Sequence, residues 1–246
     1  NLDFTPQYAN MTSLDMTYGK SDIKATGKLE NVINYVLSDG VVTGDLNINS
    51  QKIDLTELMG EEESGDSKTN SSSTESGATR VPKRINFTTN ANIQEILYDD
   101  IVMTNVKGNL VLKNEEVKLN AITANMLGGQ AKINGAYNTK EVGKPVINFK
   151  YDVNDFDINQ TFKQVNTIAK IAPIAQYLDG KFSSNFSFNS LLEDDFMPDM
   201  SMINGLGNVH ISYASFLNFP VFQSVSNTIK IPMLDLDKAT IKNAWT

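Results

Sequence analysis

The sequence predicts a mainly β protein: a curved antiparallel sheet, or half-open β-groove, of tandem repeats, with two amphipathic helices. Three observations lead to this fold class. Apolar and polar residues alternate with a period of two over most of the chain, as they do in strands with one solvated face. Two segments instead place apolar residues three and four apart, which is the spacing of one helix face. The chain also resembles itself at a spacing of roughly a hundred residues, which is typical of a tandem repeat.

The predicted strands each carry one apolar face and one polar face. Ile85, Phe87, Thr89, Ala91 and Ile93 share a face, and the residues between them are Asn, Thr and Gln. Such one-sided alternation favours antiparallel pairing, and strands of about 9–12 residues favour a curved sheet over an immunoglobulin-like sandwich. The same alternation predicts further strands around residues 23–29, 42–48, 102–112, 117–121, 131–137, 147–153, 182–188 and 209–213.

Two helices are predicted where the alternation fails. The first runs over residues 159–178, with Asn159 as its N-cap and Gly180 just after its end, and Pro173 should kink it or split it in two. The second covers residues 219–229. A shorter helical turn is expected at residues 54–58, where an Asp and a Glu stand three apart as in a capping box.

The chain divides into residues 1–60, a first β-repeat portion, residues 61–82, an acidic and Ser-rich linker, and residues 83–246, a second β-repeat that holds both helices. From Glu61 to Arg80 the linker has no aromatic and no β-branched aliphatic residue, so we expect it to be disordered. It is either a tolerated loop insertion or a partner-binding tail. The two repeats are expected to form one continuous structural unit, excised from a longer chain, since the sequence does not begin with Met.

The repeat is predicted from two similar strand endings. Leu46-Asn-Ile-Asn49 is followed by Ile53-Asp-Leu, and Tyr151-Asp-Val-Asn154 is followed by Phe156-Asp-Ile. In both places a strand ends and a corner containing Asp opens a helix. The segments that begin at Tyr18 and at Leu127 match at nearly the same spacing.

Composition excludes several classes of function. The chain has 246 residues, a net charge of −8, one His and no Cys. The acidic balance argues against nucleic acid, whose binding depends on Lys and Arg. Without Cys, and with His210 as the only His, no zinc cluster of His and Cys can be assembled, and a lone His on a strand is far more often a solvated or hydrogen-bonded residue than a catalyst. The acidic run from Asp152 to Asp157 lacks the Gly and the final Glu of a calcium loop. We therefore predict no enzyme activity, no catalytic residue, no cofactor and no metal.

The candidate site is the apolar face of the sheet. It is either an ordinary packed core or a groove that binds lipid, and both interpretations remain open. The predicted groove residues are Ile85, Phe87, Ile93, Ile147, Phe149, Tyr151, Phe182, Phe186 and Phe188. The first predicted helix would act as a lid over the groove through Phe162, Val165 and Ile168.

The order of several short motifs resembles the C-terminal region of AsmA-like proteins of the Bacteroidetes cell envelope. The resemblance covers most of the chain from about Leu14, and its motifs are short and degenerate. They are the Gly128-Gly129 hairpin, Phe149-x-Tyr151-x-Val153, Phe156-Asp-Ile158, Leu178-Asp-Gly180, Met197-Pro-Asp199, Asn204-Gly205-Leu-Gly207, Leu217-Asn-Phe219-Pro220 and Ile241-Lys-Asn243. Where the family usually has Asp-Gly in the last block, this chain has Asn243-Ala244.

The resemblance implies a periplasmic location and an anchor in the inner membrane, through a segment that this sequence does not contain. It also implies a role in outer-membrane biogenesis and lipid transport, with a phospholipid or fatty acyl chain as the partner. The alternative is a structural or protein-binding β-domain, adhesin-like or an assembly scaffold, that has no lipid ligand.

Overall fold

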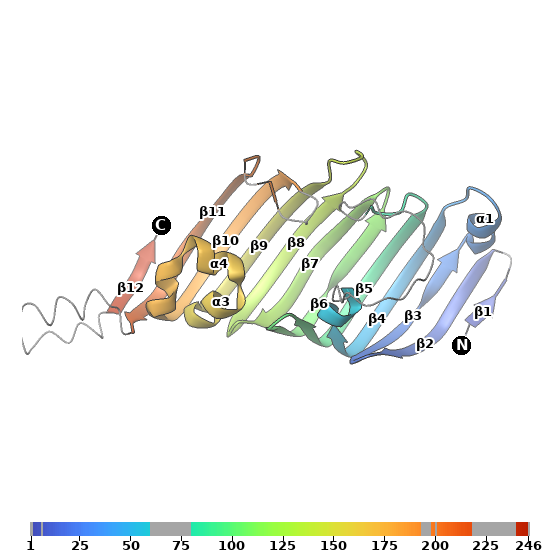
Figure 1. Cartoon of the computed structure of the whole chain (residues 1–246). Helices are drawn as coiled ribbons and strands as arrows, with labels where there is room; N and C mark the ends of the chain where they lie inside the picture. Colours follow the sequence, from blue (N-terminus) through green and yellow to red (C-terminus); the bar gives the residue numbers. More distant parts are fainter. Residues whose placement is uncertain are drawn as a thin grey trace, which may run out of the picture. The chain divides into compact units, whose positions relative to one another are not determined.

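The computed structural model of the chain describes residues 2–5, 7–59, 80–192, 198–199, 201–217 and 240–245 (Figure 1). Over these residues the fold is mainly β, as predicted. Twelve strands form one open sheet, and they follow one another in it in the order in which they occur along the chain. The strands are β1 (Leu2–Phe4), β2 (Tyr8–Tyr18), β3 (Ser21–Glu30), β4 (Val42–Asp54), β5 (Ile85–Tyr98), β6 (Ile101–Lys113), β7 (Glu116–Met126), β8 (Gly129–Asn138), β9 (Val146–Asp157), β10 (Leu178–Leu191), β11 (Asn204–Phe216) and β12 (Thr240–Trp245).

The sheet is mixed, which corrects the prediction of an antiparallel sheet. The pairs β1–β2, β2–β3, β3–β4, β5–β6 and β11–β12 are antiparallel. β4 and β5 are parallel, with Val42 opposite Ile85 and Asp54 opposite Leu97. Parallel neighbours need a long crossover, because the chain must return to the same end of the sheet before the second strand begins. The connection between Asp54 and Ile85, which includes the predicted linker, provides that length.

The chain separates into two compact units. Unit 1 comprises residues 1–124, 132–150 and 187–206, and unit 2 comprises residues 125–131, 151–186 and 207–246. Several long strands therefore contribute residues to both. The organisation predicted from the sequence, with a linker at residues 61–82 between two repeats, stays a prediction.

The core of unit 1 forms where the alternation of β5 and β6 changes phase. Ile93 and Ile96 are three residues apart on β5, yet both are buried in one cluster with Val106 of β6. Asn105 has a left-handed φ of 53°, so β6 turns there and presents Val106 and Met103 to this cluster. A strand of strict period two would send residues three apart to opposite faces.

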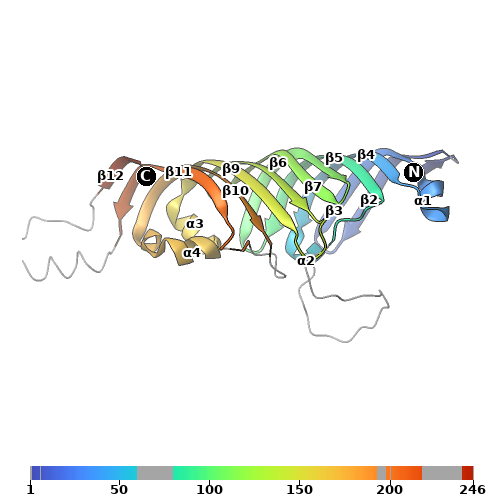
Figure 2. The same cartoon turned by 90° about the horizontal axis from the view of Figure 1, so that it is seen from above.

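Helix α2 (Leu55–Met59) adds Leu55 to the core of unit 1, and Figure 2 shows the helix beside the strands. An Asp54 carboxylate oxygen accepts a hydrogen bond from the Glu57 backbone N–H at 3.0 Å, as a helix N-cap does. Glu57 in turn accepts a hydrogen bond from the Lys20 N–H in the β2–β3 turn at 2.8 Å. The helical turn predicted at residues 54–58 is confirmed.

In unit 2, the helical segment predicted over residues 159–178 forms three short elements, so the predicted split at Pro173 is confirmed and a further break at Val165 was not predicted. The three elements are α3 (Ile158–Gln164), α4 (Asn166–Ile171) and the 3₁₀ helix η1 (Pro173–Tyr177). The chain is extended at Val165, with φ −111° and ψ 95°, so α3 ends before Pro173 is reached. Ala172 is also non-helical, as expected for a residue that precedes proline, and Pro173 starts the 3₁₀ helix.

The predicted N-cap Asn159 is wrong. Asp157 holds this position, because its Oδ1 accepts a hydrogen bond from the Gln160 N–H at 2.8 Å while its own backbone is extended. Gly180 lies inside β10 and does not end a helix. Asp54 and Asp157 thus cap the two helices at the two strand endings whose sequences resemble each other, whereas the tandem repeat itself stays a prediction.

Four further elements were not predicted, namely β1, β2, β12 and helix α1 (Val32–Leu37). Arg84 holds the α1 segment by donating hydrogen bonds to the carbonyl oxygens of Tyr35, Ser38 and Gly40. The predicted helix at residues 219–229 lies outside the described residues, as does most of the predicted linker. No helix within the described ranges has the length and apolar character needed to cross a bilayer.

Candidate functional site

All nine predicted groove residues lie on strands. Ile85, Phe87 and Ile93 are on β5, Ile147, Phe149 and Tyr151 are on β9, and Phe182, Phe186 and Phe188 are on β10. Six of them belong to unit 1, and Tyr151, Phe182 and Phe186 belong to unit 2. The residues of each unit are described separately.

The apolar face of unit 1 is only partly buried. Phe149 and Phe188 pair across β9 and β10 with ring centroids 5.7 Å apart and tilted by 49°. Both rings are half-buried, as are Ile85, Phe87 and Ile147. Ile93 differs, because it is 7% exposed and belongs to the core beside α2. Five of the six predicted positions in unit 1 therefore keep apolar surface accessible to a ligand.

Glycines on this face leave room for the large side chains beside them. A Cβ on Gly135 would lie 3.3 Å from the Phe149 ring and 3.8 Å from Leu119 Cδ1. A Cβ on Gly44 would lie 3.1 Å from the Phe87 ring. Aromatic side chains that lie over glycines of a neighbouring strand are a known device for stabilising sheets. Leu119, Gly135, Phe149 and Phe188 thus share one face of unit 1.

The apolar face of unit 2 carries two further aromatic pairs between β9 and β10. Tyr151 and Phe186 have ring centroids 6.1 Å apart, and Phe156 and Phe182 meet edge to face at 6.0 Å. Phe156 is 5% exposed, whereas Tyr151, Phe182 and Phe186 are half-buried. One end of this face is therefore core, and the other end is partly accessible.

The helices of unit 2 explain this difference in burial. Val165, between α3 and α4, packs against the cluster of Leu127, Ala131, Val153 and Phe156. Phe162 of α3 packs against a second cluster that contains Leu178 and Ala214, and Ile168 of α4 is half-buried. Two of the three predicted lid residues therefore contact buried clusters, and Figure 2 shows α3 and α4 along one face of unit 2.

The opposite face of unit 1 carries a ladder of asparagines that the sequence analysis did not identify. In the parallel β4–β5 pair, Asn90 Nδ2 donates to Asn47 Oδ1 and Asn92 Nδ2 donates to Asn49 Oδ1, both at 3.3 Å. The ladder continues through Asn109, which donates to Asn90 at 3.0 Å, and through Asn120, which donates to Asn109 at 3.1 Å. Stacked amides of this kind are typical of in-register parallel strands.

A sequence signal for this ladder exists. The pattern Asn-x-Asn-x-Gln-x-Ile occurs at residues 47–53 and again at residues 90–96. The structure sets the two copies side by side in register, so that like residues pair. Lys52 and Glu95, at equivalent positions in the two copies, form an ion pair of 2.7 Å.

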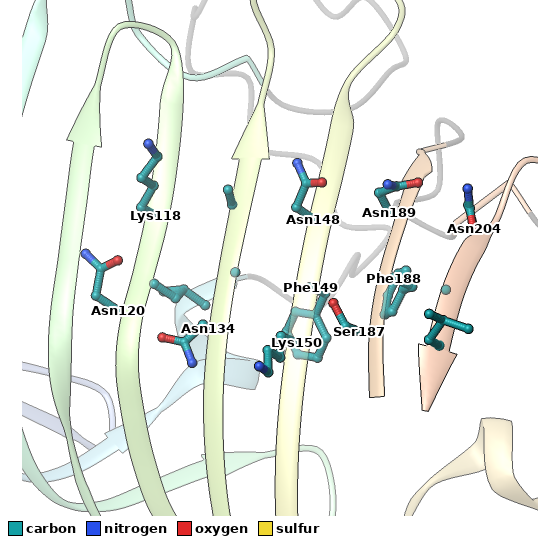
Figure 3. A pocket seen from close by; sticks show the side chains of 15 residues that line it. Lys118, Asn120, Asn134, Asn148, Phe149, Lys150, Ser187, Phe188, Asn189 and Asn204 are labelled. Carbon is teal, nitrogen blue, oxygen red and sulfur yellow. The ribbon is translucent and has the colours of Figure 1, made fainter. Parts of the chain in front are cut away.

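Unit 1 also contains a shallow trough with a volume of about 480 Å³. Figure 3 shows Lys118, Asn148, Asn189 and Asn204 in one row across strands β7 to β11. Asn120, Asn134, Lys150 and Ser187 also line it, as do the apolar residues Leu119, Phe149, Phe188 and Leu206, and none of its lining residues is a carboxylate. Amides, an alcohol and ammonium groups can hydrogen-bond a polar ligand, but they do not provide a nucleophile with an adjacent base.

Side chains from neighbouring strands hold the irregular points of the sheet. Asp22 Oδ1 on β3 accepts hydrogen bonds from the backbone N–H groups of Lys52 at 2.7 Å and Gln51 at 2.9 Å. Asn134 Oδ1 accepts from the Ala121 N–H at 2.8 Å, where Ala121 has a φ of 49°. The backbone hydrogen bonds from Lys52 and then Gln51 hold the pKa of Asp22 below its ordinary value, because they stabilise the carboxylate.

Metal binding finds no support in the described part of the chain. No group of three or more His, Asp and Glu there could hold a metal ion. His210 is a half-buried residue of β11. The acidic segment from Asp152 to Asp157 is the end of β9, where Asp157 serves as the cap of α3.

A comparison of this chain with protein-family models, curated proteins and solved structures finds no match in any of the three.

Proposed function

We propose that this chain is a non-enzymatic lipid-binding module that guides acyl chains along the apolar face of unit 1. The observation that supports it best is the incomplete burial of Ile85, Phe87, Ile147, Phe149 and Phe188. In a two-layer domain, large apolar residues on an inward-facing sheet are covered by the second layer. Here they retain surface that an acyl chain can cover.

The expected affinity is measurable. Burial of a methylene group is worth about 0.8 kcal/mol, so a fatty acid that buries about eight methylenes gains about 6 kcal/mol. That corresponds to a dissociation constant of about 40 µM before the cost of ordering the chain is subtracted. Weak, reversible binding suits a surface along which lipid moves.

The wider setting is proposed from the resemblance to AsmA-like proteins alone. It comprises outer-membrane biogenesis, a periplasmic location, and attachment to the inner membrane through a segment outside this sequence. The phospholipid or fatty acyl partner is supported both by this resemblance and by the half-buried aromatic residues.

The second candidate is a structural or protein-binding β-domain without a lipid ligand. The asparagine ladder of β4–β7 favours it, because amide ladders rigidify repetitive sheets whatever lies on the other face. On this alternative, the half-buried apolar residues would contact a protein partner.

Binding of a fluorescent fatty acid separates the two candidates. Phe149→Ser and Phe188→Ser should each weaken binding, while the parent protein binds in the micromolar range. The matched controls are Gln94→Ser and Thr123→Ser, which change exposed residues of β5 and β7 outside the trough. Unfolding midpoints of all variants verify that the sheet is intact. No binding by the parent, or equal losses in variants and controls, would contradict the lipid proposal.

A further inference from the structure

The tripeptide Ile-Asn-Gly occurs at two places in unit 1. One copy is Ile133-Asn134-Gly135 on β8, and the other is Ile203-Asn204-Gly205 at the start of β11. An Asn that precedes Gly is prone to lose its side-chain amide, because glycine has no Cβ to keep its backbone nitrogen away from the Asn side chain. The local sequence is the same in both copies, so a difference in their reactivity must come from the structure around them.

The reaction needs only the two residues and water. The glycine backbone nitrogen gives up its proton and attacks the Asn Cγ, a five-membered succinimide closes, and the side-chain nitrogen leaves as ammonia. Water then opens the ring at either carbonyl and yields aspartate or isoaspartate, so the net change is one water consumed and one ammonia released. Ring closure requires the Asn backbone to rotate out of the extended conformation, and a firmly held strand prevents this rotation.

Asn134 is held firmly in the sheet. Its strand, β8, lies between β7 and β9. Asn134 Oδ1 accepts the hydrogen bond from the Ala121 N–H at 2.8 Å. The next residue is closely packed, since a Cβ on Gly135 would lie 3.3 Å from the Phe149 ring and 3.6 Å from the Asn148 carbonyl oxygen. Rotation at Asn134 would break the hydrogen bond and disturb this packing, so the residue is protected.

Asn204 is held much less firmly, because it is the first residue of β11. The first six residues of this strand are all exposed, and Leu206 is 84% exposed. In the described part of the chain, β12 pairs with β11 only from His210 onward, which leaves Asn204 with a neighbouring strand on one side. Its side chain makes no hydrogen bond to any residue that the structure describes. Such strand ends open at little cost in free energy.

We propose that Asn204 is a site of spontaneous deamidation in the folded protein, through a succinimide formed with the Gly205 nitrogen, whereas Asn134 is protected. This inference does not depend on the proposed lipid binding. The product alters the trough of unit 1, because Asn204 is one of its lining residues (Figure 3). Aspartate or isoaspartate at this position introduces a carboxylate where the lining has none, and isoaspartate also lengthens the main chain by one methylene at the start of β11.

The test follows both tripeptides in one sample of the full, folded chain. The protein is incubated at mildly alkaline pH, which favours the deprotonated glycine nitrogen, and is then digested at acidic pH to stop the reaction. Mass spectrometry reports replacement of the side-chain NH₂ by OH in each peptide. Deamidation at Asn204 should be at least about tenfold faster than at Asn134, because strand ends open more readily than strand centres. Equal rates, or a faster reaction at Asn134, would overturn the proposal.

The same incubation in urea provides the matched reference. In the unfolded chain the two residues should react at similar rates, because they share Ile-Asn-Gly and differ only in what surrounds it. Unfolding should therefore accelerate the reaction at Asn134 far more than at Asn204. If the difference between the two persists in urea, the wider sequence causes it, and the assignment to the structure fails.

The variant Gly205→Ala tests the nitrogen that closes the ring. Gly205 does not have a left-handed φ, so alanine fits its backbone conformation. The added methyl group hinders approach of the nitrogen to Asn204 Cγ, so deamidation at Asn204 should fall to near the rate at Asn134, which itself should not change. An undiminished rate at Asn204 would mean that water hydrolyses the amide directly, and it would overturn the succinimide route.

Discussion

The aromatic pairs of unit 2 provide the sharpest test of how the apolar face is covered. Phe156 and Phe186 are on neighbouring strands, and each faces an aromatic partner at about the same distance, 6.0 Å and 6.1 Å. Phe156 is 5% exposed beneath Val165, whereas Phe186 is half-buried. Truncating each to Ala removes the same atoms from two different environments.

The expected costs differ because only one site leaves a cavity. Phe156→Ala should lower the free energy of unfolding by about 3–5 kcal/mol, since the emptied space is enclosed and water cannot fill it. Phe186→Ala should cost about 1–2 kcal/mol, the sum of partial burial and one aromatic pair. A typical domain is stable by only about 5–15 kcal/mol, so the first change should also reduce the yield of folded protein.

The assay is urea unfolding followed by circular dichroism, with both variants and the parent measured in one buffer. The difference between the variants should be at least about 1 kcal/mol, with Phe186→Ala the more stable of the two. Equal costs near 4 kcal/mol would refute the reasoning, because they would mean that Phe186 is as fully packed as Phe156. The apolar face of unit 2 would then be an ordinary core.

Three further predictions concern local contacts. Asp22→Asn should lower the free energy of unfolding at neutral pH. Because the folded pKa of Asp22 is depressed, its contribution should be present above the ordinary pKa of 3.8 and disappear as the pH falls through the folded value. The free energies of unfolding of parent and variant, measured by chemical unfolding from pH 7 to pH 3, should therefore converge in acid. Asp157→Ala should cost about 0.5–2 kcal/mol through loss of the cap of α3, whereas Asn159→Ala should be nearly neutral. A lower melting temperature for Asn159→Ala than for Asp157→Ala would contradict this assignment of the cap. Gly129→Ala should cost about 2 kcal/mol or more, because the new Cβ would overlap backbone atoms of β9. Gly143→Ala should cost only about 1 kcal/mol, because Gly143 has a φ of 69° but lies in open space. Similar melting temperatures for the two variants would argue against the close contact at Gly129.

Local patterns predicted the strands but not all of their partners. The alternation of Ile85, Phe87 and Ile93 identified β5 and its apolar side, because a period of two needs no knowledge of the neighbouring strand. One-sided alternation also suggested antiparallel pairing throughout. It could not reveal the parallel β4–β5 pair, because a parallel strand with one solvated face has the same pattern.

The candidate site was only partly predictable for a similar reason. The aromatic residues of β9 and β10 were identified from the sequence, and the structure pairs Phe149 with Phe188 and Tyr151 with Phe186. Ile93 was assigned to the groove with them, although α2 and the phase change of β6 make it core. The asparagine ladder was missed, since its signal is a match between two segments separated by a long connection.

What the sequence determined by itself is what depends on neighbours along the chain: the β class, the solvated outer face, and the position of the helical segment after β9. Only the tertiary structure decided which strands pair, where the helix first breaks, and which aromatic residues stay accessible. Val165 shows the difference, because it was predicted as one turn of a helix stripe and instead is extended and packs on Leu127 and Phe156. Burial of that kind depends on residues far away in the sequence, and its free energy exceeds the small local preference for continuing a helix.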